Sequence, residues 1–452
     1  MPLKGFAVKA ESETTTLIVA TFLVANAFVW YLSAFDFLHA DFSGKSFLIV
    51  ISVGIACLVA SAFSVTVSMK RFSQRLAFLK YWMLGGFLFS VALAFPNFAN
   101  LPSAVAASAI LGVYFGVGMP ICMGYFSATT KPEIRAKTGA VIILAIGLGF
   151  PFLSSIGSSQ LLFAGALAIW RLSAFAAPFI FRPEEKTAEA KQTVSYRSVF
   201  ANRTFLLYLV PWFMFELINE LANEINKGYF ASLPKVFFHN YMVVEIILSG
   251  ISAVACGFLA DRKGRKRVAL FGFALLGLGY AALGISSSIN SSLAVYSAAW
   301  FYVAADGTAW GAFAMLFLVT IWGDIARERN SEKFYFIGVL PYLISNLAGQ
   351  MMGPLISAGI LESTVFSFAS FFLFIAILPL AYAPETLPEK IMIKLDMDDY
   401  VAKALGKVKK EPSKKPLREV DDEAEEENCQ AVVADPSVED GEAEKLAEKY
   451  YY

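Results

Sequence analysis

Twelve long apolar segments recur along the chain, separated by short polar loops. Each is close to the ~20 apolar residues that a helix needs to cross a bilayer, whose hydrocarbon core is about 30 Å thick. Their apolar runs do not alternate with polar residues, so they predict helices rather than the strands of a membrane barrel. The first six predicted spans are 15–35, 46–68, 76–95, 103–127, 138–157 and 160–181. The second six are 204–223, 239–260, 267–286, 293–322, 335–359 and 364–383.

Lysine and arginine are concentrated in alternate loops. The loops after the second, fourth, eighth and tenth predicted spans, together with the segment 183–203, are rich in these residues. The remaining loops contribute only Lys45, Lys227 and Lys235. Because short loops rich in Lys and Arg stay in the cytoplasm, both chain termini are expected there. The pattern therefore predicts a multi-pass protein of the cell membrane with an even number of spans.

The pattern also divides the chain into regions. Two six-helix halves are predicted at 1–182 and 204–383, joined by a cytoplasmic linker at 183–203. The tail at 384–452 is rich in Lys and Pro and then strongly acidic at 421–427. Such a composition buries too little apolar surface to fold alone, so we expect a largely disordered tail with a short interfacial helix at 388–408. A solvated tail without a specific role and a regulatory or partner-binding tail are both left open.

Composition supports a membrane protein and disfavours other classes. Hydrophobic residues make up 57% of the chain and charged residues only 16%, which is more apolar than a soluble domain. The four cysteines, Cys57, Cys122, Cys256 and Cys429, are isolated, so neither a disulfide framework nor a zinc site is expected. No metalloprotease, serine-hydrolase or phosphate-loop motif is present, which disfavours an enzyme and ATP hydrolysis. We expect no cofactor and no nucleic-acid partner.

The two halves resemble each other weakly. The sixth predicted span is followed by Pro183-Glu184 and the twelfth by Pro384-Glu385, and the basic loops recur at a similar offset. Parallel repeats of this kind imply a pseudo-two-fold axis along the membrane normal. We therefore expect a cavity between the halves that opens to alternate sides.

One loop carries a family resemblance. Residues 257–266, Gly-Phe-Leu-Ala-Asp-Arg-Lys-Gly-Arg-Lys, resemble the signature loop of the major facilitator superfamily. The segment Pro132–Gly139, the Gly- and Pro-containing fifth span and Pro384-Glu385-Thr386 support the resemblance, which covers about 12–390. It implies an all-α membrane fold of twelve helices in two pseudo-symmetric halves. The equivalent first-half loop, 68–75, keeps the basic character but lacks the acid and the glycine.

The signature loop contains candidate gate residues. Its tight turn requires Gly264, and Asp261 is suited to accept hydrogen bonds from a helix N-terminus. The resemblance implies that Asp261 faces the start of span five near Thr138 and Gly139. It also implies that basic side chains of the loop pair with nearby acids when the cytoplasmic side is shut. This candidate gate comprises Asp261, Arg262, Gly264, Arg265, Asp324 and Arg135, with Glu328 as a further partner. The alternative is that these basic residues only fix topology.

Ionisable residues inside predicted spans are candidate binding groups, because they are expensive to place in a membrane. Span seven carries a polar stripe at i, i+3, i+4 and i+7. Span ten places an acid between two aromatic residues at helical spacing, and span eight carries an acid followed by two serines. These groups are, in order, Glu216, Asn219, Glu220 and Asn223; Tyr302, Asp306 and Trp310; and Glu245, Ser249 and Ser252. They can instead reach the outer interface or hold helices together.

The first half is poorer in charge. The resemblance implies that the first, fourth, seventh and tenth helices line the cavity. From the first half we expect lining residues at Asn26, Trp30, Ser33, Tyr114, Cys122 and Tyr125. Arg171 is expected near the middle of the membrane, paired with an acid or with a substrate carboxylate. A cavity acidic on one side and aromatic on the other suits a cation, a proton or a hydroxyl-rich solute better than a polyanion.

These features together predict a secondary transporter. Burial disfavours the ionised form of a carboxyl group, so a buried acid can load and unload a proton as the cavity changes sides. We expect alternating access with a small organic solute and protons as partners, in a protein that works as a monomer. Symport, antiport and facilitated diffusion stay open. A transporter-like membrane receptor or scaffold without transport activity is the alternative.

Overall fold

The structure is a computed structural model of the chain. It describes residues 2–68, 74–95, 98–156, 159–183, 194–289, 291–327, 331–388, 391–394, 397, 400 and 401, without the side chains of residues 2–11. The chain separates into two compact units, residues 1–397 and 398–452. Of the second unit the structure describes only residues 400 and 401, so the fold below is that of the first.

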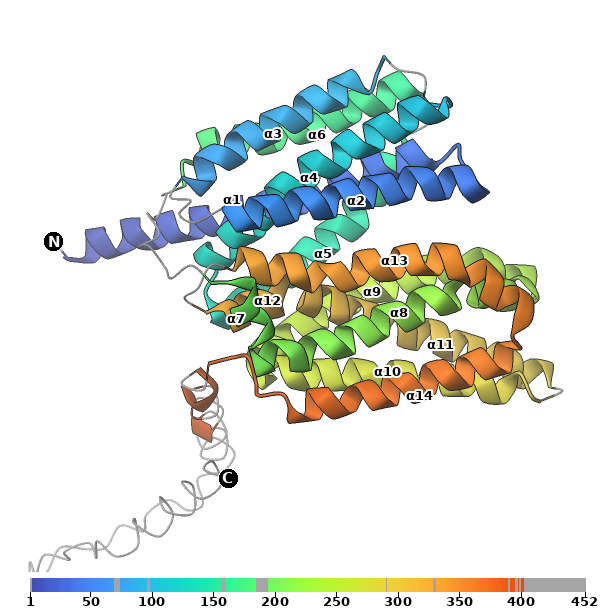
Figure 1. Ribbon diagram of the computed structural model, residues 1–452. Coiled ribbons are helices and arrows are strands. Elements are labelled where there is room, and N and C mark those ends of the chain that lie inside the picture. The colour runs from blue at the N-terminus through green and yellow to red at the C-terminus, as the bar shows by residue number, and fades with distance from the viewer. Residues whose placement is uncertain are drawn as a thin grey trace, which may run out of the picture. The chain divides into compact units, whose positions relative to one another are not determined.

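The described part of the chain is helical, and its long helices form two groups (Figure 1). The first group comprises α1 (Pro2–His39), α2 (Gly44–Ser68), α3 (Arg75–Ala92), α4 (Leu101–Thr129), α5 (Pro132–Ser155) and α6 (Gln160–Phe181). The second comprises α8 (Arg203–Ala231), α9 (Lys235–Lys263), α10 (Arg265–Ser286), α11 (Ser292–Phe313), η1 (Ala314–Thr320), α12 (Ile321–Ala326), α13 (Glu332–Gly359) and α14 (Glu362–Tyr382). A short helix, α7 (Tyr196–Phe200), lies in the predicted linker.

Each predicted span overlaps one long helix or, for span ten, the run from α11 to α12. Among the described residues, ten helices are long and apolar enough to cross a membrane. The helices α3 and α13 fall outside this set because polar residues lower their hydropathy: Arg75 and Lys80 in α3, Asn346 and Gln350 in α13. The count of twelve spans therefore stays a prediction at this point.

Apolar side chains cover the outside of the helix bundle as well as its core. On α14, for example, Phe368, Phe371 and Leu378 are each more than half exposed. Large exposed apolar faces are unfavourable in water and are expected where a helix faces lipid. The outward faces of these helices are therefore suited to the hydrocarbon interior of a membrane.

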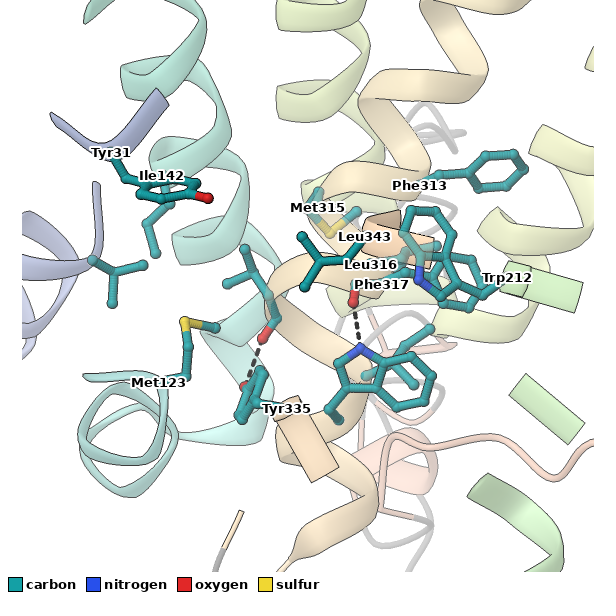
Figure 2. Packing of buried hydrophobic residues seen from close by; sticks show 14 of the residues in the cluster. Tyr31, Met123, Ile142, Trp212, Phe313, Met315, Leu316, Phe317, Tyr335 and Leu343 are labelled. Carbon is teal, nitrogen blue, oxygen red and sulfur yellow. Dashed lines mark hydrogen bonds between the residues drawn. The ribbon is translucent and has the colours of Figure 1, made fainter. Parts of the chain in front are cut away.

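The predicted tenth span is not a single regular helix. Seven residues near its C-terminal end, Ala314–Thr320, form a π-helix, which inserts extra backbone into the helical turn. The Thr320 hydroxyl donates to the Met315 carbonyl at 2.8 Å, five residues earlier. Figure 2 shows the surrounding packing, in which the Trp212 and Phe317 rings are stacked with centroids 4.9 Å apart. This segment lies in the interior of the bundle, where its backbone is shielded from lipid.

Two sequence expectations for the tail fall mostly outside the described residues. Residues 391–394 of the expected interfacial helix at 388–408 are helical, and most of the rest of that range is not described. The predicted disorder beyond it also lies outside the described residues.

Candidate functional site

A cluster of buried charges joins the two halves at the end of the bundle that carries the basic loops, which we call the basic end. The Asp324 carboxylate of α12 accepts a hydrogen bond from Arg135 Nη1 of α5 and another, at 3.0 Å, from Arg265 Nε of α10. All three side chains are at most 5% exposed. Arg135 also donates to the Ser127 and Thr130 carbonyls, at 2.9 and 2.8 Å. Because α5 belongs to the first half and α12 to the second, this cluster ties the halves together.

Asp261 makes a second link across the halves. Its Oδ1 accepts from the Ala136 amide at 3.1 Å and its Oδ2 from the Lys137 amide at 2.8 Å. These amides belong to the fifth and sixth residues of α5, close to its N-terminus, where the helix dipole favours an anion. The residues contacted are two positions earlier than the expected Thr138 and Gly139. Arg265 Nη2 lies 2.8 Å from Asp261 Oδ1, so the arginine connects Asp261 with Asp324.

Glu385, in the Pro-Glu-Thr segment that follows the last helix, caps the start of α10. Its Oε1 accepts from the Arg265 amide at 2.8 Å and its Oε2 from the Lys266 amide at 3.1 Å. These are the first amides of α10, so Glu385 satisfies them as a cap. The expected partner Glu328 lies outside the described residues, and its pairing with Arg262 or Arg265 stays a prediction.

A third link between the halves involves a residue that sequence reasoning left without a role. Arg75 Nη2, at the start of α3, lies 2.5 Å from Glu332 Oε1, at the start of α13. The first-half loop lacks the signature acid and glycine, so no specific partner was predicted for it. The structure supplies the acid from the other half instead. The first-half loop therefore takes part in joining the halves despite its different sequence.

A cavity of about 610 Å³, which we call the central cavity, is lined by both halves. Its lining residues come from α1, α2, α4 and α5 of the first half and from α9, α11, η1 and α13 of the second. Of the residues predicted to face a cavity, Glu245, Ser249 and Trp310 line this one. Sequence reasoning missed Tyr31 and Tyr342, which also line it. The sequence does contain a sign of this face, because Phe28, Tyr31 and Leu32 are spaced to lie on one side of α1.

The charge cluster and Tyr335 separate the central cavity from a polar vestibule at the basic end. The vestibule has a volume of about 1360 Å³, and Arg135, Gly323 and Asp324 line it. Tyr335 lines the central cavity, and its hydroxyl donates to the Val319 carbonyl of η1 at 2.7 Å (Figure 2). A Cβ atom on Gly323 would lie only 2.6 Å from the Tyr335 hydroxyl, so the barrier is tightly closed.

The polar stripe predicted on α8 is present, and it points mainly toward α13. Glu216 is fully buried, and neither of its carboxylate oxygens has a hydrogen-bond partner among the described residues. It lies within electrostatic range of Glu220 and of Tyr342, a residue that lines the central cavity. Glu220 accepts a 3.4 Å hydrogen bond from Asn346. Asn219 and Asn223 are half-buried on the same helix.

Asp306 belongs to a second buried polar group. It is 5% exposed, and its Oδ1 has no hydrogen-bond partner among the described residues. It interacts electrostatically with Glu245 on α9 and with Tyr302 one turn earlier on α11. Asn226 donates to the Tyr280 and Tyr302 hydroxyls at 3.3 and 3.0 Å. Sequence reasoning missed Asn226, although it continues the spacing of the polar stripe on α8.

The first-half candidates form a packed cluster rather than a cavity wall. Arg171 is fully buried, and its guanidinium lies 4.7 Å from the Trp30 ring and 4.5 Å from the Trp82 ring. It donates to Asn26 Oδ1 at 3.3 Å and to the Tyr114 hydroxyl at 3.1 Å. These residues do not line the central cavity, and neither do Ser33, Cys122 and Tyr125.

The expected acidic partner of Arg171 is not observed within the described part of the chain. Aromatic rings take its place, because α6 packs against α1 and α3 inside the first half. A guanidinium held between aromatic faces gains cation–π attraction without a carboxylate. The expectations that Arg171 pairs with an acid of the protein, and that Asn26, Trp30 and Tyr114 line the central cavity, are therefore not met in this structure. Pairing with a substrate carboxylate stays a prediction.

Comparison with known proteins identifies the fold. No protein-family model and no curated sequence matches the chain. Among solved structures, the proton:xylose symporter XylE of the major facilitator superfamily, bound to 6-bromo-6-deoxy-D-glucose, aligns with a TM-score of 0.60 and 15% identity over 83% of this chain and 97% of that chain. A bacterial homologue of the iron transporter ferroportin, in an outward-facing state, aligns with a TM-score of 0.59 and 16% identity over 85% and 99%.

The human organic anion transporter MFSD10 aligns with a TM-score of 0.56 and 14% identity over 82% of this chain and 99% of that chain. At such low identity the solutes of these proteins do not transfer, but the alignments extend over nearly the whole of each relative. The apolar outward faces of the helices agree with the membrane setting of these structures. The chain therefore has the fold of the major facilitator superfamily.

Proposed function

We propose that the chain is a secondary transporter that moves a small organic solute across the cell membrane by alternating access. The observation that carries this proposal is the barrier at the basic end. It separates a cavity shared by both halves from a vestibule, and its links run from one half to the other. A barrier built between two halves opens when they rock apart, whereas a barrier within one half would not.

The topology follows from the charge pattern of the loops. We assign α3 and α13 as the two remaining spans, which gives twelve, with the run from α11 to α12 counted as one. The short basic loops support a cytoplasmic position for the basic end and for both termini. In this assignment the conformation described here is closed toward the cytoplasm.

Opening toward the cytoplasm requires that the links between the halves break. These are the Arg135–Asp324 pair, the hydrogen bonds from the α5 amides to Asp261, and the Arg75–Glu332 pair. A hydrogen bond to a charged group contributes about 1.5–3 kcal/mol, so the set stabilises the closed state by several kcal/mol. Solute binding, proton binding or both must offset this difference for the two states to interconvert.

Proton coupling is the proposed energy source, with Glu216 and Asp306 as its carriers. Both are buried, and neither carboxylate oxygen of Glu216 nor Oδ1 of Asp306 has a hydrogen-bond partner among the described residues. An isolated ionised carboxylate is expensive to bury, so such a group tends to bind a proton when it is enclosed and to lose it when water enters. Glu216 lies behind Tyr342 and Asp306 behind Glu245, and both of these partners line the cavity. Protonation at either acid can therefore be coupled to solute binding.

The first experiment is electrogenic transport by the purified protein in sealed liposomes. An inward proton gradient is applied, and sugars, amino acids, carboxylates and organic cations are screened for a solute-dependent current. Counterflow of labelled solutes covers electroneutral exchange. We expect signal with at least one class. If folded, reconstituted protein gives neither a solute-dependent current nor counterflow, the result contradicts transport and favours a transporter-like receptor or scaffold.

A further inference from the structure

The wall of the central cavity is mostly apolar and rich in aromatic rings. Phe28 and Tyr31 of α1 and Phe115 of α4 line it from the first half, and Trp310 of α11 and Tyr342 of α13 line it from the second. The Tyr31 and Phe115 rings stack with centroids 3.9 Å apart and an interplanar angle of 14°. At about 610 Å³ the cavity falls in the ~300–1,000 Å³ range of small-molecule sites. Its size and lining therefore suit an organic solute with a large apolar surface.

Glu245 is the one charged side chain among the described residues that line this cavity. It forms no hydrogen bond or ion pair with any described residue, so its carboxylate is available to a ligand. Ser249 lies one turn further along the same helix and also faces the cavity. A carboxylate on an aromatic wall offers a positive group both a counter-charge and π faces.

The same wall fits other solute classes poorly. An anion would need a basic group, but Arg171 is enclosed by Trp30 and Trp82, and Arg135 lies on the vestibule side of the barrier. A sugar would need many hydrogen-bonding groups, whereas most of the residues that line this cavity are apolar. A metal ion would need several ligands, and the described residues contain no group of three or more His, Cys, Asp or Glu side chains that could hold one.

We propose that the solute is an apolar organic cation, held in the central cavity with its positive charge on Glu245 and its apolar body against the aromatic wall. This inference rests on the proposed transport function and names its substrate class. It differs from the xylose, iron and organic anions that appear in the names of the structural neighbours.

The test is equilibrium binding of radiolabelled tetraphenylphosphonium to the purified full chain in detergent. Tetraphenylborate, an anion of the same shape, separates charge recognition from apolar partitioning. Glu245→Gln removes the charge at nearly constant volume, and Glu362→Gln is the matched control, because Glu362 is exposed at the start of α14. We expect wild type and Glu362→Gln to bind the cation equally and Glu245→Gln to bind it roughly tenfold or more weakly. Tetraphenylborate should show no binding above the detergent background.

A measurement on the unmodified chain covers the case in which Glu245→Gln does not fold. Dicyclohexylcarbodiimide, an apolar carboxyl reagent, should modify Glu245, and tetraphenylphosphonium should protect that residue in peptide mass spectra while tetraphenylborate does not. Equal cation binding by wild type and folded Glu245→Gln, equal binding of the cation and the borate, or absence of protection would each overturn the inference.

The binding assay does not depend on transport, so the two proposals fail separately. If tetraphenylphosphonium does not bind but another solute class drives a current, the cation inference is wrong and the transport function stands. If it binds at Glu245 and no solute is transported, the site stands and the transport function is wrong.

Discussion

At the scale of single residues, Gly264 sets the geometry of the loop between α9 and α10. Its φ of +99° and ψ of 153° lie in a region that residues with side chains rarely adopt. A Cβ atom there would also lie 2.3 Å from Glu385 Oε2, the group that caps α10. Both the backbone conformation and the close approach of Glu385 therefore require glycine at this position.

We predict that Gly264→Ala lowers the free energy of unfolding by about 1–3 kcal/mol, because it adds strain and displaces the cap. The measurement is the thermal unfolding midpoint of the purified protein. Gly228→Ala is the matched control, since a Cβ on Gly228 meets no atom within 4 Å. An equal midpoint for Gly264→Ala and Gly228→Ala would show that the loop relaxes freely.

Asp261 is the acceptor that connects the signature loop with α5. Replacing it by Asn keeps its size but removes the negative charge that the α5 amides and Arg265 contact. We predict that Asp261→Asn slows turnover by roughly tenfold, through a weaker closed state, and leaves solute affinity unchanged. Initial counterflow rates and binding constants test this, with the exposed Asp41→Asn as control. An unchanged rate would mean that the loop only fixes the membrane topology and does not control the barrier.

At the scale of helices, the contact between α5 and α9 holds the basic end shut. An added Cβ on Gly257 of α9 would lie 2.7 Å from the Ala140 Cβ and 2.9 Å from the Ala136 carbonyl oxygen of α5. The same turn of α5 donates its amides to Asp261. The close approach of the two helices at Gly257 is therefore a condition for the link that Asp261 makes.

We predict that Gly257→Val separates α5 from α9 and opens the central cavity to the cytoplasm. The reporter is a cysteine in place of Met123, which lines the cavity, with the native cysteines replaced by alanine. A membrane-impermeant thiol reagent on the cytoplasmic side should label it faster in the Gly257→Val background. Gly165→Val is the control, since a Cβ on Gly165 meets no atom within 4 Å. Equal labelling in the two backgrounds would mean that this contact does not control the barrier.

The positions of the long helices could be predicted from the sequence, whereas the π-helix and the short helix α7 could not. Continuous apolar runs mark where a helix crosses a membrane, so each predicted span overlaps a helical run. The π-helix at Ala314–Thr320 could not be predicted, because its residues are as apolar as the α-helical turns around it. Likewise α7 is only five residues long, too short to produce a periodic pattern.

At the scale of the whole molecule, contacts between the halves divide into predictable and unpredictable ones. The contact of Asp261 with the start of α5 was expected because the signature loop has a recognisable sequence. The Arg75–Glu332 pair was not, since its two residues are 257 positions apart and neither lies in a recognisable motif. The direction of the first-half side chains was misjudged for a related reason. Trp30 and Tyr31 are neighbours, and the apolar pattern around them does not indicate which one faces the cavity.

The two buried acids Glu216 and Asp306 carry the central claim that solute movement is coupled to protons. Both can be changed to their amides with little change in volume, and neither lines the cavity, so its wall stays intact. Without a titratable group, solute can still exchange across the membrane, but an imposed proton gradient can no longer drive it uphill. Accumulation and exchange therefore respond differently to these two variants.

The most direct measurement is accumulation of the solute in sealed liposomes under an inward proton gradient, compared with counterflow in the same vesicles. We predict that wild type accumulates solute, and that Glu216→Gln and Asp306→Asn each fold and exchange solute but do not accumulate it. Normal proton-driven accumulation by both variants would contradict the account.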